Sequence, residues 1–204
     1  MYGIDVSKHQ GLIDWKKAHK HIDFAIIRAG YGTSIDAKAE RNVFYCERYK
    51  IPFGLYWFSY ATTEKQAVKE AETLLEFIGD RKIPLPIWFD YEYESDQYAK
   101  SKGKNITKEL RTRIAEAFCS RIEHEGYYVG IYANLDYVYN YFDARLFKRY
   151  DLWLAAWVEN QPFSVSIWQY TNKGNIEGIT GDVDMNKCNA DLINIIKNKK
   201  LNNT

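Results

Sequence analysis

The chain has 204 residues, of which 46% are hydrophobic, enough for one sizeable core and short for two independent ones. Its 28 basic and 27 acidic residues give a formal net charge of +1, so we expect no nucleic-acid partner. No apolar run approaches membrane-spanning length, which excludes membrane insertion. Three widely spaced cysteines and four histidines show no disulfide or metal-binding pattern, so we expect no metal.

Short runs of apolar, β-branched and aromatic residues predict strands, and two amphipathic patterns predict the clearest helices. One helix is expected over 63–78, where Thr63 and Gln66 form a capping-box signature, and another over 107–125. Less regular helices are expected around residues 14–19 and 40–50. The expected strands are 2–6, 24–28, 53–58, 87–93, 128–132, 152–156, 166–169 and 183–186.

Strands that alternate with helices imply right-handed crossovers and a parallel sheet, either open or closed. Eight strands with three weak crossovers favour an irregular TIM-like β/α barrel in a single α/β domain. An open, doubly wound sheet is the alternative, but no glycine-rich phosphate turn follows the first strand. We assign residues 1–196 to this domain and the Asn/Lys-rich residues 197–204 to a polar tail or the start of a linker.

Polar and aromatic residues recur where the successive strands are expected to end. In β/α barrels these ends gather at one mouth, which holds the active site. We therefore expect one mouth to be lined by Asp5, Arg28, Tyr56, Trp57, Asp90, Glu92, Tyr132, Trp157, Gln169 and Asp184.

Residues 87–94 change from an apolar run to carboxylates at alternate positions, which predicts that Asp90, Glu92 and Glu94 share one face of a strand. Crowding and burial would raise the pKa of one carboxyl group, as a general acid requires. A separation of about 6 to 7 Å falls between the two glycosidase geometries and leaves the stereochemistry open. The alternative is that this segment has left the barrel and its carboxylates are solvated.

Short motifs follow one another in order between about residues 2 and 190: Gly3-Ile-Asp-Val-Ser7, Ile26-Ile-Arg-Ala-Gly-Tyr-Gly32, Gly54-Leu-Tyr-Trp-Phe58, Trp88-Phe-Asp-Tyr-Glu92, Gly130-Ile-Tyr132, Trp153-Leu-Ala-Ala-Trp157, Trp168-Gln-Tyr170 and Val183-Asp-Met-Asn186. Together they resemble glycoside hydrolase family 25. These are lysozymes of the Chalaropsis type, which are common among bacteriophage endolysins. The ordered set is much more specific than any single motif.

The resemblance implies an N-acetylmuramidase that hydrolyses the β-1,4 bond between N-acetylmuramic acid and N-acetylglucosamine in peptidoglycan, without metal or organic cofactor. It implies that Glu92 is the general acid and that Asp90 stabilises the charge on the cleaved sugar. Asp5 and Asp184 match the supporting acids of the family. The intermediate is left open between a glycosyl-enzyme and an oxazolinium ion, and we favour the second.

Five further residues are predicted to bind substrate: Tyr56, Tyr132, Trp157, Gln169 and Arg28. Ordinary barrel packing is the alternative for the aromatic residues. For Arg28, the alternatives are a pair with one of the mouth acids and a purely structural salt bridge.

Two other functions remain open at this point. A chitinase-like glycosidase would carry a longer run of acids, from which Trp88 and Phe89 depart, and a decayed sugar-binding module would not keep its acids intact. The first residues do not form a signal peptide, so we expect synthesis in a host cytoplasm and action on the wall after release. Many endolysins of this type carry a wall-binding module, and we expect one after the carboxyl end of this segment.

Overall fold

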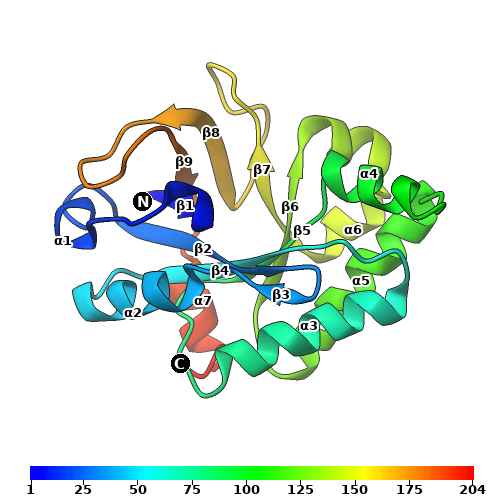
Figure 1. Cartoon of the computed structure of the whole chain (residues 1–204), viewed down its shortest axis with the longest axis horizontal. Helices are drawn as coiled ribbons and strands as arrows, with labels where there is room; N and C mark the ends of the chain where they lie inside the picture. Colours follow the sequence, from blue (N-terminus) through cyan, green and yellow to red (C-terminus); the bar gives the residue numbers. More distant parts are fainter.

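Eight strands close into a barrel in the computed structural model, which describes residues 1–204 (Figure 1). The order around the barrel is β1-β2-β4-β5-β6-β7-β8-β9, and β9 pairs with β1 to complete the ring, so the closed alternative is confirmed. Strand β3 only extends β2 as a short hairpin. The strands are β1 (Tyr2–Val6), β2 (Phe24–Tyr31), β3 (Ser34–Ile35), β4 (Phe53–Phe58), β5 (Ile87–Asp90), β6 (Val129–Asn134), β7 (Asp151–Ala155), β8 (Ile167–Gly174) and β9 (Val183–Cys188).

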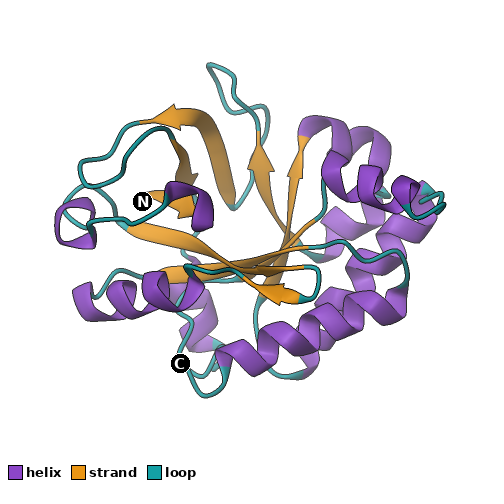
Figure 2. Cartoon of the chain, viewed as in Figure 1, coloured by secondary structure: helices purple, strands orange, loops and turns teal.

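Strand β9 runs antiparallel to both its neighbours, whereas the other barrel strands are parallel to one another. No helix separates β8 from β9, and a short loop can join neighbouring strands only in the antiparallel sense (Figure 2). The amino end of β9, rather than its carboxyl end, therefore lies at the mouth of the barrel.

The two clearest predicted helices are confirmed. Thr63 caps α3 by accepting the N–H of Gln66 at 3.2 Å, but the Gln66 side chain bonds to Thr62, so only half of the predicted capping box forms. None of the helices is both long and apolar enough to cross a membrane. The helices are α1 (Trp15–Ala18), α2 (Ala39–Tyr49), α3 (Glu64–Ile78), α4 (Tyr93–Ser101), α5 (Lys108–His124), α6 (Ala144–Arg149) and α7 (Leu192–Asn198), with short helical turns η1 (Lys8–Gln10) and η2 (Tyr137–Tyr141).

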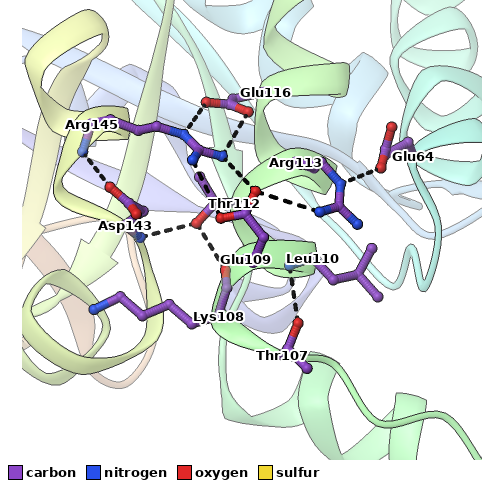
Figure 3. A network of polar contacts seen from close by, with 10 residues as sticks. All are labelled: Glu64, Thr107, Lys108, Glu109, Leu110, Thr112, Arg113, Glu116, Asp143 and Arg145. Carbon is purple, nitrogen blue, oxygen red and sulfur yellow. Dashed lines mark hydrogen bonds and ion pairs between the residues drawn. The ribbon is translucent and has the colours of Figure 1, made fainter.

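A surface network of charged side chains links three of these helices (Figure 3). Arg145 of α6 bonds to Glu109 and Glu116 of α5, each at 3.0 Å. Arg113 of α5 bonds to Glu64 of α3 at 2.7 Å. Exposed pairs contribute less than about 1 kcal/mol each, so this network fixes how the helices lie against one another more than it stabilises the fold.

The side chains of β5 alternate between the barrel interior and the layer beneath the helices. Trp88 and Asp90 point inward, whereas Ile87 and Phe89 join the core between barrel and helices. The large Trp88 ring fits because Gly130 has no side chain; a Cβ there would lie 2.3 Å from it. The interior below Asp90 is thus a packed apolar floor, and only the last inward position of each strand is free for chemistry.

The segment 197–204 folds back against the base of the barrel. Asn202 is 1% exposed, and its side-chain amide donates to the carbonyl oxygens of Ile83 and Leu85 at 2.9 and 3.0 Å. The same side chain accepts the N–H of Tyr128 at 2.6 Å. The composition of this segment gave no hint of these contacts. That it leads into a linker stays a prediction.

Candidate active site

A cavity of about 270 Å³ opens at the mouth of the barrel, where β1, β2, β4 and β5 end. Every residue predicted to be catalytic or to bind substrate, except Trp157, lines it. The structure thus brings together residues that lie up to 179 positions apart in the chain. They are Asp5, Arg28, Tyr56, Asp90, Glu92, Tyr132, Gln169 and Asp184.

Glu92 does not lie on β5, so this part of the sequence prediction is wrong. Strand β5 ends at Asp90, and Glu92 is the N-cap of α4, where its N–H donates to Ser95 Oγ at 3.1 Å. Glu94 and Asp96 occupy the first turn of α4, where the helix dipole favours negative charge. The alternating acids thus lie where strand β5 ends and helix α4 begins. The separation of about 6 to 7 Å expected for alternate residues of one strand does not apply to Asp90 and Glu92.

The carboxyl groups of Asp90 and Glu92 nevertheless lie in hydrogen-bonding contact. Burial, and then the charge of Glu92, raise the pKa of Asp90 well above its usual range. Burial, and then the charges of Glu94 and Asp184, raise the pKa of Glu92 to about 7. Two touching carboxyl groups do not both ionise readily, so the pair holds a proton near neutral pH. Glu92 is the more exposed member and faces the cavity.

Asp5 and Asp184 form a second pair, on neighbouring positions of β1 and β9. Burial, and then the charge of Asp184, raise the pKa of Asp5 well above its usual range, and burial raises the pKa of Asp184. Asp184 reaches the mouth from the amino end of β9 because that strand is antiparallel. The prediction that Asp184 lies at the mouth is therefore confirmed, but the expected reason is wrong, because Asp184 lies near the amino end of its strand and not at the carboxyl end.

Two amide side chains hold Asp5. Gln169 Nε2 and Asn186 Nδ2 both donate to Asp5 Oδ2, at 2.9 and 2.7 Å. Asn186 is fully buried and in turn accepts the indole N–H of Trp153 at 2.7 Å. Both amides bond to the same oxygen of Asp5, and its other oxygen takes no amide donor. Asn186 lies within one of the sequence motifs, but the motif alone predicted no role for it.

Arg28 pairs with Asp36, not with one of the four mouth acids. Its Nε and Nη2 atoms both lie 2.8 Å from Asp36 Oδ2. Asp36 also accepts the backbone N–H groups of Lys8 and Lys38, at 3.1 and 2.8 Å. Of the two alternatives for Arg28, the structure thus shows the structural salt bridge, with Asp36. The positive charge of the Arg28 guanidinium still acts in the cavity, because it lowers the pKa of Asp90 against the larger increase caused by burial.

The predicted sugar-binding aromatics occupy two kinds of position. Tyr56 and Tyr132 form the cavity wall, edge-on against Trp153 with ring centroids 5.8 and 4.6 Å from it. Trp157 is 57% exposed beyond the end of β7 and does not line the cavity. Its indole N–H and the Tyr132 hydroxyl both donate to Gln169 Oε1 at 3.3 Å. That these rings contact sugar stays a prediction.

Two further side chains, His9 and Glu94, line the cavity and extend outward from it. The sequence motif does not include Glu94, but its place in the first turn of α4 brings it close enough to raise the pKa of Glu92 after the effect of burial. No group of three or more His, Cys, Asp or Glu side chains is arranged to hold a metal ion.

Known proteins resemble this chain in sequence or in fold. The uncharacterized protein YegX of Escherichia coli K12 is 26% identical over 201 residues, which cover 93% of this chain and 70% of YegX. The modular autolysin LytC of Streptococcus pneumoniae, whose structure was determined with a synthetic peptidoglycan ligand, is 27% identical with a TM-score of 0.80. That match covers 91% of this chain but only 46% of LytC, so this chain spans less than half of that protein.

A second structure matches over almost its whole length. It is the catalytic domain of endolysin ply40 from bacteriophage P40 of Listeria monocytogenes, 27% identical with a TM-score of 0.75 over 97% of both chains. The family model of glycosyl hydrolases family 25 matches residues 4–179, which include three of the four mouth acids. Most of the barrel and most of its polar mouth thus lie within one family pattern, and the chain belongs to glycosyl hydrolases family 25.

Proposed function

We propose that this glycoside hydrolase is an N-acetylmuramidase, a lysozyme that cleaves the β-1,4 bond between N-acetylmuramic acid and N-acetylglucosamine and so lyses bacterial cell walls. The contact between Asp90 and Glu92 carries the proposal. It places a carboxyl group with a pKa of about 7 at an open cavity, which is the requirement for a general acid near neutral pH.

In the proposed mechanism, Glu92 gives its proton to the oxygen of the glycosidic bond as that bond breaks. The transfer leaves both carboxyl groups ionised, and the negative charge of Asp90 stabilises the positive charge that develops on the cleaved sugar. The Asp5–Asp184 pair keeps its own proton and contributes a further negative charge beneath the sugar. Asp184 also helps to raise the pKa of Glu92, after burial and Glu94.

We further propose that the acetamido group of the substrate, and not an enzyme carboxylate, attacks the sugar. Nucleophile and acid lie on opposite sides of the scissile bond in a double displacement, about 5 Å apart. Here Asp90 and Glu92 touch each other on one side of the cavity, which suits Asp90 to orienting the acetamido group. A thiazoline analogue of N-acetylglucosamine should then inhibit competitively. Absence of inhibition at millimolar concentration would contradict substrate assistance without affecting the glycosidase assignment.

Mass spectrometry of digested peptidoglycan tests the proposed bond specificity. A muramidase releases fragments with muramic acid at the reducing end, which borohydride converts to muramitol. Fragments that end in reduced glucosamine would instead identify a glucosaminidase. Glu92→Gln protein, prepared in parallel, controls for contaminating hydrolases because an amide cannot give up the required proton.

We propose that a wall-binding module acts together with this chain, since the structural match to LytC covers only 46% of that modular protein. We also propose synthesis in a host cytoplasm followed by release to the wall. Fusing a known wall-binding module after Thr204 should raise lysis of intact cells more than hydrolysis of soluble glycan strands.

A further inference from the structure

A groove leads from the catalytic cavity toward the β2–β3 hairpin and the loop between β4 and α3. It consists of the catalytic cavity of about 270 Å³, a middle hollow of about 300 Å³ and a far hollow of about 310 Å³. The middle hollow shares residues with both of the others. Those shared with the catalytic cavity are His9, Arg28, Phe58 and Glu94, and those shared with the far hollow are Tyr31 and Tyr60.

The far hollow is lined by aromatic rings and neutral polar groups. Tyr60 from the β4–α3 loop and Tyr98 from α4 have ring centroids 5.0 Å apart, and Tyr31 from β2 faces the same space. Gln66 of α3 and Ser34 of β3 add an amide and a hydroxyl group. Flat rings beside neutral hydrogen-bonding groups suit the apolar faces and hydroxyl edges of a pyranose sugar.

The far hollow has a single basic side chain, and its one acidic side chain, Glu70, is buried. Its lysine, Lys69, lies 3.3 Å from Glu72 in an ion pair on α3. A peptide rich in carboxylates would need an unpaired Lys or Arg there. The stem peptides of peptidoglycan fit this hollow less well than the glycan does.

The wall of the far hollow is fixed to the catalytic strand. The N–H of Tyr60 donates to the buried carboxyl group of Glu70 at 3.0 Å, and the N–H of Ser59 donates to the carbonyl oxygen of Asp90 at 2.8 Å. Glu70 Oε2 is buried without a hydrogen-bond partner, so Glu70 serves this loop at a cost in desolvation. The loop that carries Tyr60 is therefore held at a set distance from the reacting groups.

We propose that the far hollow is a saccharide subsite, which binds a sugar of the glycan strand remote from the cleaved bond. Three connected hollows of similar size match a polymer of similar units, and the aromatic lining selects its sugars over its peptides. This inference rests on the proposed function, because it takes the glycan as substrate. It adds that the enzyme prefers long strands, and it names Tyr98 as a residue that determines this preference.

Tyr98→Ala tests the proposal with little risk to folding, because Tyr98 is 40% exposed and alanine favours helix. On long, peptide-free glycan strands we expect kcat/KM to fall about tenfold, through KM. On the shortest oligosaccharide that is cleaved, it should stay within about twofold. Tyr98→Phe keeps the ring and should retain activity on both. Tyr2→Ala, at the opposite end of the barrel, is the matched control.

Equal activity of Tyr98→Ala and the parent on long strands would overturn the subsite, as would an equal loss on long and short substrates. A loss confined to peptide-bearing strands would show a peptide site instead. A binding measurement keeps this test separate from the proposed function. In the Glu92→Gln background, calorimetry with peptide-free strands should show about tenfold weaker binding when Tyr98 is also replaced by alanine. Unchanged binding there would refute the subsite even if the parent enzyme is an active muramidase.

Discussion

The two carboxyl pairs at the mouth of the barrel differ in how they are held. Asp5 receives two amide donors on one oxygen and is 6% exposed, so the Asp5–Asp184 pair is locked in one arrangement. The Asp90–Glu92 pair has no amide donor, and Asp90 Oδ1 is buried without a hydrogen-bond partner. Burial raises the pKa in both pairs, but amide donors hold only the Asp5–Asp184 pair.

We propose that this difference separates a pair that keeps its proton, Asp5–Asp184, from a pair that gives its proton to the substrate, Asp90–Glu92. Fixed donors around Asp5 select a single proton position, whereas Glu92 begins a helix and reaches the open cavity. A general acid must be able to pass its proton to the substrate, so the less constrained pair is the one expected to react. The predictions below test this division of roles.

Glu92→Gln should have the largest effect. The amide preserves the size of the side chain but cannot donate the catalytic proton, so kcat should fall at least about 1,000-fold. Turbidity loss of isolated walls measures activity, and thermal unfolding checks that the fold is intact. Activity within a few-fold of the parent would remove Glu92 from the reaction and with it the distinction between the pairs.

Asp90→Asn should cost about 100- to 1,000-fold in kcat, as expected for the loss of one charge that stabilises the transition state. The negative charge beside the cleaved sugar disappears, while the contact with Glu92 is kept as a neutral hydrogen bond. Steady-state rates on soluble glycan strands give kcat and KM separately. A change confined to KM would show that Asp90 only binds the ground state.

Asp5→Asn should cost much less, about tenfold in kcat. An asparagine imitates a protonated Asp5: its oxygen accepts from Gln169 and Asn186, and its amide donates to Asp184. Asp184 remains the charged member of that pair. A loss as large as that of Asp90→Asn would mean that Asp5 reacts in its ionised form and that the two pairs are not different in kind.

Glu94→Gln should have the smallest effect, a shift of the pH profile. Burial and then the Glu94 charge hold the pKa of Glu92 at about 7, and activity should fall as pH rises through that value because the acid loses its proton. Without the Glu94 charge the pKa of Glu92 falls, so the alkaline limb should move to lower pH by less than about one unit. A shift to higher pH, or an unchanged profile in kcat/KM, would contradict the electrostatic role of Glu94.

The sequence predicted all eight barrel strands and the two longest helices, because apolar periodicity and end signals are local. It did not predict α4, which begins at Glu92: the alternation of acids after Asp90 also fits a strand, and only the neighbouring strands β4 and β6 show where pairing stops. Helices α6 and α7 were also not predicted. Their stability comes from packing against the barrel more than from their own residues.

By itself, the sequence predicted which residues meet at the mouth of the barrel and to which family the chain belongs, since motifs and periodicity are properties of neighbouring positions. Only the tertiary structure decided which acids pair, that Arg28 pairs with Asp36, and that Asn186 holds Asp5. It also decided that a far hollow continues the catalytic cavity. Each of these features depends on distances between strands and loops that are remote in the chain. Closure of the barrel and the antiparallel β9 set those distances, and no local sequence pattern encodes them.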